Sequence, residues 1–178
     1  MSQFMDLCLR RQTCREFSDK PVEHEKLVAC VDAARLAPSG CNAQPWSFVA
    51  VEKPETVKQV GECVLQLGMN PYAAAAKAFV VIVEEPATLM PKISCLVEGQ
   101  YFAKGDLGAA TAYLCLEAAS QELGTCQFGI FDRVKMRTIL NIPGDKPISA
   151  LIGIGYPLHP ETVRPKQRKS LEEVARFI

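Results

Sequence analysis

Apolar positions along the chain recur at two spacings, one typical of helices and one typical of strands. Apolar residues three or four positions apart indicate a helix face, whereas an alternating or continuous apolar run indicates a strand. The helical spacing occurs at Phe4, Leu7 and Cys8, at Leu27, Val28, Val31 and Ala34, at Val57, Val60, Val64 and Leu67, and from Val134 to Leu140. We expect Pro38 to stop the second of these helices and Gly68 to end the third.

Four further segments have the pattern of strands, namely Trp46–Glu52, Ala78–Val83, Cys126–Phe131 and Ile148–Ile154. The first alternates and is expected to be largely buried, and the β-branched second segment is expected to be a central strand. Ser170 and Glu173 form a possible capping box for a short last helix. Helices and strands in this irregular order favour an α+β sandwich over a strictly alternating doubly wound sheet.

The segment between Asp106 and Gly124 is apolar nearly all round. Asp106 is a plausible N-cap and Gly124 a plausible C-cap of one long helix. A helix with this profile is predicted to be buried on every side, either in the core or against a second subunit.

Length and charge limit the classes of protein to consider. With 178 residues we expect a single domain over residues 1–178. The 20 acidic and 20 basic residues leave no net charge to attract nucleic acid or an anionic membrane, so any basic site is local. The chain begins without a signal-peptide pattern and has no apolar run long enough to span a bilayer, which predicts a soluble, cytoplasmic protein.

The eight cysteines include no C-x-x-C pair, and the two histidines, His24 and His159, complete no zinc-ligand pattern. Most of these thiols are expected to be small buried hydrophobic side chains, and no metal site is expected. Cys14 and Cys41 differ from the others because they fall inside polar runs that carry candidate chemistry. Nearby cations would lower the pKa of either thiol.

The first of these polar runs, Arg10–Phe17, places cations around small hydrogen-bonding side chains. A phosphate monoester requires guanidinium or ammonium donors together with hydroxyl and backbone N–H groups. Arg11, Thr13, Arg15, Lys166 and Arg168 are residues of these types. The alternatives are a solvated helix face for the first run and a surface loop for the second.

The second polar run, Pro38–Trp46, places Ser39, Asn42 and Gln44 in a turn between a helix and a strand. One polar side chain satisfies an ordinary loop, so three indicate a binding role, although turn chemistry beside a core tryptophan remains the alternative. Glycines at both ends of the run 124–129 indicate close approach of a ligand or of backbone, or else a simple helix C-cap.

These runs, in this order, resemble the motifs of the FMN-dependent nitroreductase superfamily. The resemblance extends from end to end of the chain through a basic motif at Arg11–Phe17, a turn at Ala37–Trp46, an alanine-rich helix at Asp106–Ala118, the segment Leu123–Phe131, Gly155-Tyr156-Pro157 and a basic loop at Arg164–Arg168. It implies a nitroreductase-like three-layer sandwich, with a mixed, mainly antiparallel sheet between helices, that works as a homodimer.

The resemblance also assigns roles to individual residues. The FMN phosphate would be held by Arg11, Lys166 and Arg168, with Gln12 and Thr13 along the ribityl chain and Arg15 at the flavin N1 and C2 carbonyl. Pro38, Ser39, Gly40 and Asn42 would come from the second subunit. Asn70, Gln127, Phe128 and Gly129 would lie beside the isoalloxazine.

The implied activity is an oxidoreductase that moves hydride from NAD(P)H through FMN to a small electron-poor acceptor, a nitroaromatic or a quinone, by a ping-pong mechanism. The flavin performs the hydride chemistry, so no catalytic acid or base is expected from the protein. Two alternatives remain open. One is a flavoenzyme of the same fold with a flavin-processing or dehalogenating activity, and the other is a low-turnover redox sensor that uses Cys14 or Cys41.

Overall fold

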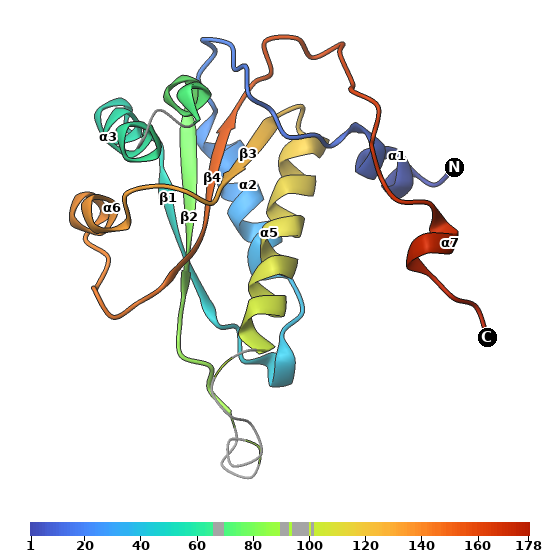
Figure 1. Ribbon diagram of the computed structural model, residues 1–178. Helices are drawn as coiled ribbons and strands as arrows, with labels where there is room; N and C mark the ends of the chain where they lie inside the picture. The colour runs from blue at the N-terminus through green and yellow to red at the C-terminus, as the bar shows by residue number, and fades with distance from the viewer. Residues whose placement is uncertain (66–69, 90–92, 94–99, 101) are drawn as a thin grey trace.

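The computed structural model describes residues 1–65, 70–89, 93, 100 and 102–178 (Figure 1). Short 3₁₀ helices, η1 (Gly40–Asn42) and η3 (Pro71–Ala75), lie between the longer elements. The α-helices and strands, in chain order, are α1 (Gln3–Arg10), α2 (His24–Arg35), β1 (Trp46–Val51), α3 (Pro54–Val64), β2 (Ala78–Glu84), α5 (Phe102–Ser120), β3 (Gly124–Phe128), α6 (Arg133–Leu140), β4 (Ile148–Gly155) and α7 (Leu171–Val174).

The four strands form one sheet in the order β1-β2-β4-β3, and each neighbouring pair is antiparallel. Within the described residues, the parallel pairing expected of a mixed sheet is limited to an isolated bridge between Thr13 and Thr125. β2 is central and fully buried, as its β-branched sequence predicts. The bridge attaches the N-terminal basic run to the outer edge of β3.

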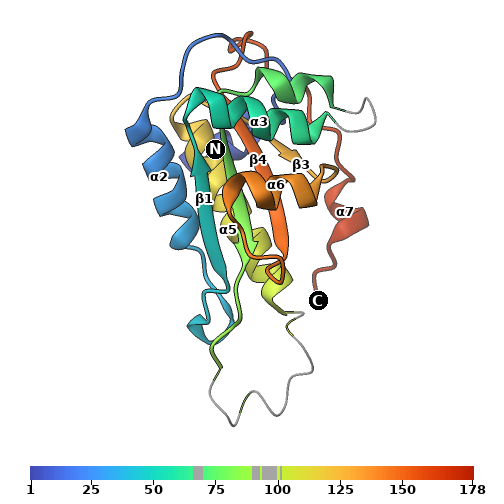
Figure 2. The same cartoon turned by 90° about the vertical axis from the view of Figure 1, so that its left-hand side faces the viewer.

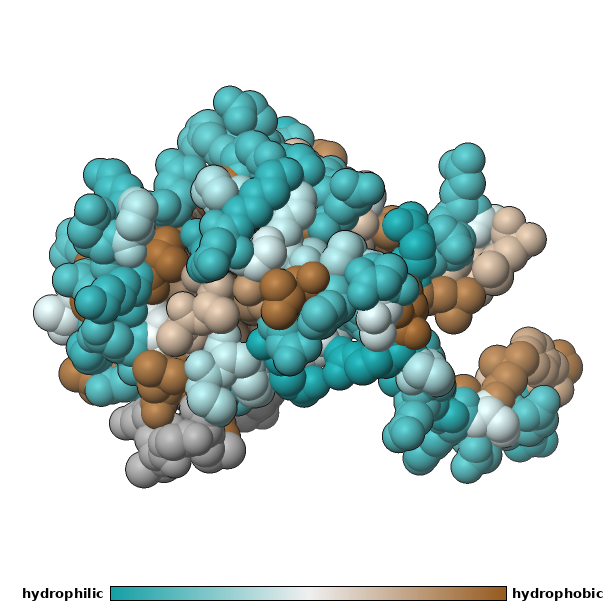
Figure 3. All heavy atoms as spheres, turned by 90° about the horizontal axis from the view of Figure 1, so that it is seen from above, coloured by the Kyte–Doolittle hydropathy of each residue, from teal (hydrophilic) through white to brown (hydrophobic). Residues whose placement is uncertain are grey.

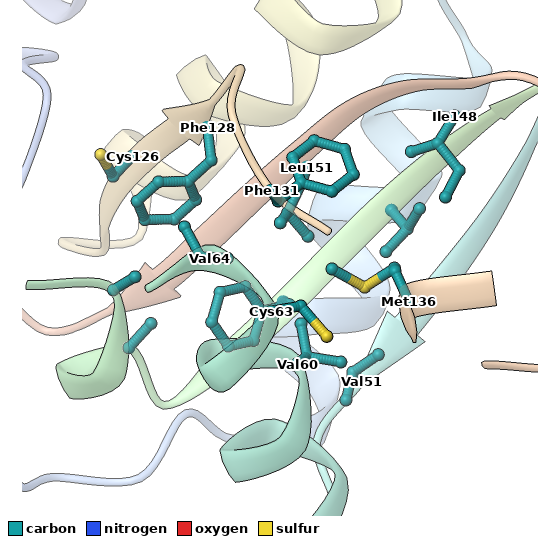
Figure 4. Close-up of a cluster of buried hydrophobic side chains, with 14 of the residues drawn as sticks. Val51, Val60, Cys63, Val64, Cys126, Phe128, Phe131, Met136, Ile148 and Leu151 are labelled. Atoms are coloured by element: carbon teal, nitrogen blue, oxygen red, sulfur yellow. The ribbon is translucent and has the colours of Figure 1, made fainter. Parts of the chain in front are cut away.

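Helices cover both faces of the sheet, which gives the three layers expected from the sequence. α2 and α5 lie on one face, and α3 and α6 lie on the other (Figures 1 and 2). The alternating side chains of β2 divide between two cores, because Val80 and Ile82 pack toward α5 whereas Phe79 and Val81 pack toward α3 and α6. Figure 4 shows the second core, where Phe128, Leu151 and Met136 meet.

β1 is less buried than predicted. Trp46 and Val51 are buried, but the residues between them are partly or fully exposed. The physical reason is the position of the strand, since β1 lies at an edge of the sheet and pairs only with β2 among the described strands. Alternation between apolar residues does not distinguish an edge strand from a central one.

The long helix differs from its prediction at both ends. α5 begins at Phe102, so Asp106 lies inside the helix and is not its N-cap. Glu122 takes the left-handed conformation, with φ of 67°, where the chain turns into the sheet, and Gly124 is the first residue of β3 rather than a C-cap. Asp106 and Gly124, which the sequence suggested as the two caps, therefore do not cap this helix.

Within the single chain α5 is not buried on every side, so of the two predicted alternatives burial against a second subunit stays a prediction. One face packs on the sheet through Leu107, Leu114 and their neighbours. The opposite face is exposed: Tyr113 has 44% of its surface accessible, and Gly105, Gly108 and Ala112 are exposed beside it. A Cβ atom added at Gly105 or Gly108 would meet no atom within 4 Å. Apolar composition alone does not separate a buried face from one left open in a single chain.

The remaining elements follow the prediction closely. The capping box is confirmed, since the Ser170 hydroxyl accepts the Glu173 N–H and the Glu173 carboxylate accepts the Ser170 N–H. The third helix ends earlier than predicted, since α3 stops at Val64 with Leu65 as its C-cap, before Gly68. Leu67 and Gly68 themselves lie outside the described residues, as does about half of the segment 86–104. Across the described helices, none is both long and apolar enough to cross a membrane.

The two ends of the chain project from the same side of the sandwich (Figure 1). Both carry exposed apolar side chains, which Figure 3 shows as brown patches on the projecting ends. These side chains are Phe4, Met5 and Leu9 near the N-terminus and Leu171, Val174, Phe177 and Ile178 near the C-terminus.

Candidate functional site

The two basic runs, 150 residues apart in sequence, line one cavity. We call this cavity and its lining the basic cradle; its volume is about 640 Å³. The lining residues are Arg11, Gln12, Thr13, Arg15, Arg164, Pro165, Lys166, Gln167 and Arg168. Five of them are cations and none is an acid, so the cavity suits an anion that accepts hydrogen bonds.

Backbone contacts fix the N-terminal wall of the cradle. α1 ends at Arg10, and the Arg11 N–H still caps it by donating to the Leu7 carbonyl at 2.8 Å. The chain then runs along the edge of β3, where the Cys14 N–H donates to the Thr125 carbonyl at 2.8 Å. Residues 11–15 therefore lie beside β3, at the outer edge of the sheet.

Gln12 ties the C-terminal wall to the N-terminal wall. Its side-chain amide donates to the Thr162 carbonyl at 2.7 Å, and its Oε1 accepts the Arg164 N–H at 3.1 Å. The Arg164 guanidinium also donates to the Thr13 carbonyl. Gln12, which the resemblance placed along the ribityl chain, thus joins the two runs through hydrogen bonds of its own.

Lys166 shows how closely the cations are packed. Its ammonium group donates to the Arg11 carbonyl, which leaves it among the guanidinium groups of the cradle. Burial and the charges of Arg11, Arg168 and Arg164 lower the pKa of Lys166. A site that disfavours its own lysine charge in this way would gain from a bound anion of high charge.

Arg15 also lines a neighbouring cavity of about 430 Å³, together with Tyr72. The Arg15 guanidinium lies over the Tyr72 ring, with Cζ 5.5 Å from the ring centroid. The Tyr72 hydroxyl donates to Asn70 Oδ1 at 2.7 Å, and Asn70 is in the left-handed conformation. Asn70 is therefore joined to Arg15 through Tyr72, a residue that the sequence did not single out.

Residues 127–129 differ in their exposure to solvent. Gln127 and Gly129 are exposed, whereas Phe128 is buried and stacks on Tyr72 with ring centroids 6.1 Å apart. Of these three residues, Phe128 offers a ligand its backbone and not its side chain. Its ring instead supports the wall that carries Arg15.

The turn Pro38–Asn42 lies at the other end of α5 from the cradle. The Gly40 N–H donates to the Asp106 carboxylate at 3.1 Å near the start of the helix. Arg11 and Gln12 share a cavity with Ala119, near its end. At 1.5 Å of rise per residue, Asp106 and Ala119 are about 20 Å apart along the helix. Within one chain the structure does not bring the two predicted halves of the site together.

Cys14 does not have the lowered pKa that its cationic neighbours suggested. The side chain is buried, with 8% of its surface accessible, and burial raises the pKa of the thiol against the smaller opposing effect of Arg164. Desolvation outweighs the cation because the thiol points into the core behind the cradle. Cys41 is exposed.

Most of the other described thiols follow the prediction: Cys30, Cys63 and Cys126 are buried, and Cys8 and Cys115 are partly buried. In the described part of the chain, no group of three or more His, Cys, Asp or Glu side chains is placed to hold a metal ion.

Gly124 is required by close packing behind the cradle. A Cβ at this position would lie 2.6 Å from Cys14 Cβ and 2.8 Å from its Sγ. We expect Gly124→Ala to displace Cys14 and with it Thr13 and Arg15, at a cost of about 1–3 kcal/mol in the free energy of unfolding.

Chemical denaturation measures the effect of Gly124→Ala. Gly144→Ala is the control, since a Cβ there would meet no atom within 4 Å. A Gly124→Ala variant as stable as Gly144→Ala would contradict the packing argument.

Sequence reasoning missed two residues of the site. Arg164 lines both the cradle and the Arg15 cavity, and Tyr72 supports Arg15. Arg164 begins the predicted basic loop Arg164–Arg168 but was given no role there. The alternating cations at 164, 166 and 168 would have assigned one, because in an extended chain every second side chain points the same way. No local pattern marks Tyr72.

Comparison with known proteins gives the class and the family. Solved structures with the same fold include a nitroreductase family protein from Streptococcus pneumoniae, with a TM-score of 0.82 and 19% identity over 99% of this chain and 100% of that one. The family model described as "Nitroreductase family" matches residues 9–156. The chain therefore belongs to the nitroreductase family, a family of oxidoreductases.

Two curated relatives are similar over most of their length. A putative NADH dehydrogenase/NAD(P)H nitroreductase of Archaeoglobus fulgidus is 28% identical over 88% of this chain and 87% of its own. An iodotyrosine deiodinase of Thermotoga neapolitana is 24% identical over 93% of this chain and 95% of its own.

Proposed function

We propose that the protein is an FMN-dependent oxidoreductase that uses NAD(P)H to reduce a small electron-poor acceptor, a nitroaromatic or a quinone, in a ping-pong reaction. The observation that carries this proposal is the basic cradle, where five cations from both ends of the chain converge with no acid among the lining residues. The family and the relative named NAD(P)H nitroreductase support the reaction class.

The donor set of the cradle fits the phosphate of FMN. Arg11, Lys166 and Arg168 supply charge, and Thr13 supplies a hydroxyl. The fit is supported by this donor set, with no acid among the lining residues. Burial, followed by the charges of Arg11, Arg168 and Arg164, lowers the pKa of Lys166, and a phosphate dianion would offset the repulsive part of that effect.

The neighbouring wall fits the ring end of the cofactor. Bound FMN would supply hydride transfer, which amino-acid side chains do not perform. Arg15, held over Tyr72, is the cation available to negative charge that reduction leaves on the ring. The exposed Gln127 and the backbone of Gly129 lie at the open edge of β3, where donors remain accessible. In this role the protein binds and orients the cofactor, and none of its side chains acts as acid or base.

We further propose that the site is completed by a second copy of the chain. Pro38, Ser39, Gly40 and Asn42 lie at the far end of α5 from their own cradle, so in a homodimer they would serve the partner's cradle. The exposed face of α5, with Gly105, Gly108 and Ala112, is the surface we propose for pairing, because small residues allow close helix contact.

Purified protein tests the cofactor and the activity directly. The expected result is a yellow protein that contains FMN, or takes it up on addition, and oxidises NADH or NADPH when a nitroaromatic or quinone acceptor is present. A protein that stays colourless after FMN is added would refute the proposal. Comparison of the two reductants shows which one the enzyme prefers.

The lowered pKa of Lys166 predicts a pH dependence of FMN affinity. Phosphate binding raises this pKa, so binding takes up a proton between the lowered pKa and the pKa of the bound state, and affinity falls as pH rises through that interval. In the protein without FMN the sign is opposite, because the unfolded chain, with the ordinary lysine pKa of 10.5, holds the proton more tightly, so stability rises with pH from the lowered pKa up to about 10.5 and levels off above it.

Flavin fluorescence quenching from neutral pH up to the ordinary lysine pKa of about 10.5 measures this dependence. Lys166→Arg is the matched variant, since a guanidinium keeps its charge throughout this range. We expect a smaller loss of affinity with pH in the arginine variant. Equal losses in the two proteins would show that Lys166 does not contact the bound phosphate.

A second candidate function is reductive dehalogenation on the same fold. It is favoured by the deiodinase relative, which aligns with nearly the whole chain. A halogenated phenol in place of the nitro acceptor distinguishes the two: release of halide faster than nitro reduction would identify the dehalogenase.

Of the two thiols considered for a redox sensor, Cys41 remains a candidate and Cys14 does not. Cys14 is buried with a raised pKa, which opposes thiolate formation and reaction with an oxidant. Cys41 remains accessible on the turn. Steady-state NAD(P)H oxidation with a nitro acceptor tests it. Failure of the flavin-loaded protein to turn over would favour the sensor, and unchanged behaviour of Cys41→Ser would remove it.

A further inference from the structure

The turn Ser39–Gln44 has an unusual backbone for a segment with one glycine. Cys41, Asn42 and Gln44 all take positive φ, at 53°, 54° and 47°. Side chains rarely adopt this left-handed region, and a bulky residue held there costs free energy that surrounding contacts must offset. The glycine of the turn, Gly40, is not among the strained positions.

Hydrogen bonds inside the turn account for part of its order. The Asn42 N–H donates to the Ser39 carbonyl at 3.0 Å, and the Ala43 N–H donates to the Gly40 carbonyl at 2.9 Å. The Ser39 hydroxyl accepts the Gln44 N–H at 3.0 Å. These bonds close the turn on itself but do not attach it to the body of the protein.

The attachment comes from Asp106 on α5. Its Oδ2 accepts the Gly40 N–H at 3.1 Å, across 66 residues of sequence. Gly40 also lies close to the first residue of the helix, because a Cβ added to it would be 3.3 Å from Phe102 Cδ2. The Asp106 carboxylate thus lies on α5 and holds the strained turn at Gly40, which can approach the helix closely because it has no side chain.

We propose that Asp106 is a positioning residue of the shared site, which fixes the Ser39–Gln44 turn in the conformation that presents Ser39 and Asn42 to the partner subunit's flavin. The inference rests on the proposed function, since the turn completes a site only if the protein is a flavin-binding dimer. It also gives the aspartate of the 106–118 motif a physical role, in place of the N-cap role that the sequence suggested.

Amide hydrogen exchange of the protein without FMN tests the attachment, so it does not depend on cofactor binding. In Asp106→Ala we expect the Gly40 amide, and those of residues 42–44, to exchange at least about tenfold faster than in the wild type. Asp106→Asn keeps an acceptor oxygen and is expected to stay within about threefold. Gly40→Ala, which presses on Phe102, is expected to behave like Asp106→Ala. Unchanged exchange in Asp106→Ala would overturn the proposal.

FMN titration then tests the positioning role. For Asp106→Ala we expect a Kd for FMN at least about tenfold above that of the wild type, with the dimer retained and with Asp106→Asn restoring most of the affinity. Faster exchange with unchanged FMN affinity and unchanged KM for the acceptor would show that Asp106 orders a turn outside the site, which overturns the inference. A wild-type protein that binds no FMN would instead refute the proposed function, while the exchange data would still report on the attachment.

Discussion

Arg168→Ala is expected to lower the affinity of the protein for FMN by about ten- to a hundredfold, whereas Lys169→Ala is expected to change it by less than about twofold. Arg168 lines the basic cradle and Lys169, the next residue, does not, although both are exposed. Hydrogen bonds to charged groups contribute about 1.5–3 kcal/mol each, which corresponds to this range of affinity. Each of the two variants loses one positive charge, and the two positions are neighbours in the chain.

Fluorescence titration of FMN at two salt concentrations separates contact from long-range attraction. Screening weakens an exposed charge more than one that contacts the phosphate, so the Arg168→Ala defect should persist at high salt. Equal losses in the two variants would show that residues 164–168 attract the cofactor without holding it. The assignment of the phosphate to the cradle would then be wrong.

Ala112→Arg is expected to convert the proposed dimer to a monomer and to abolish the tight FMN binding proposed for it. Ala112 is exposed in the single chain, so the arginine does not disturb the core, but in the proposed dimer it would place two long cations in a contact between small residues. Loss of pairing would leave each cradle without the Pro38–Asn42 turn of the other chain. Sedimentation and FMN titration measure both consequences in one sample.

Gln59→Arg is the control for the added charge, because Gln59 is exposed on α3, on the opposite face of the sheet. It should remain dimeric and bind FMN normally. Ala112→Arg protein that stays dimeric would place the interface on another surface. A monomer that keeps wild-type affinity would refute the shared site itself.

Local patterns predicted most of the fold because they report on burial one element at a time. The continuous β-branched run identified β2, and the Ser170–Glu173 pair identified the cap of α7. The same patterns do not report on position within the sheet or on what covers a helix. The edge position of β1 and the open face of α5 are set by tertiary structure. β1 was predicted as more buried than it is, whereas for α5 burial in the core alone is excluded and burial against a second subunit stays a prediction.

The site was predictable to the extent that its residue types are distinctive. The cations of Arg11 and Lys166 suggested phosphate, and the family resemblance suggested that they belong together; the structure does bring them into one cavity. The contacts that hold the site were not predictable, since Gln12 meets Arg164 and Gly40 meets Asp106 across long stretches of sequence. Burial of Cys14 behind the cradle likewise reverses the direction expected for its pKa.

The length of α5 has a consequence for genetics. The helix keeps the cradle of a chain about 20 Å from the turn of the same chain. In the proposed dimer, a chain damaged only in its cradle and a partner damaged only in its turn would therefore place both lesions on one site and leave the other site assembled from intact parts. Two alleles that are each inactive alone would therefore complement one another in the same cell.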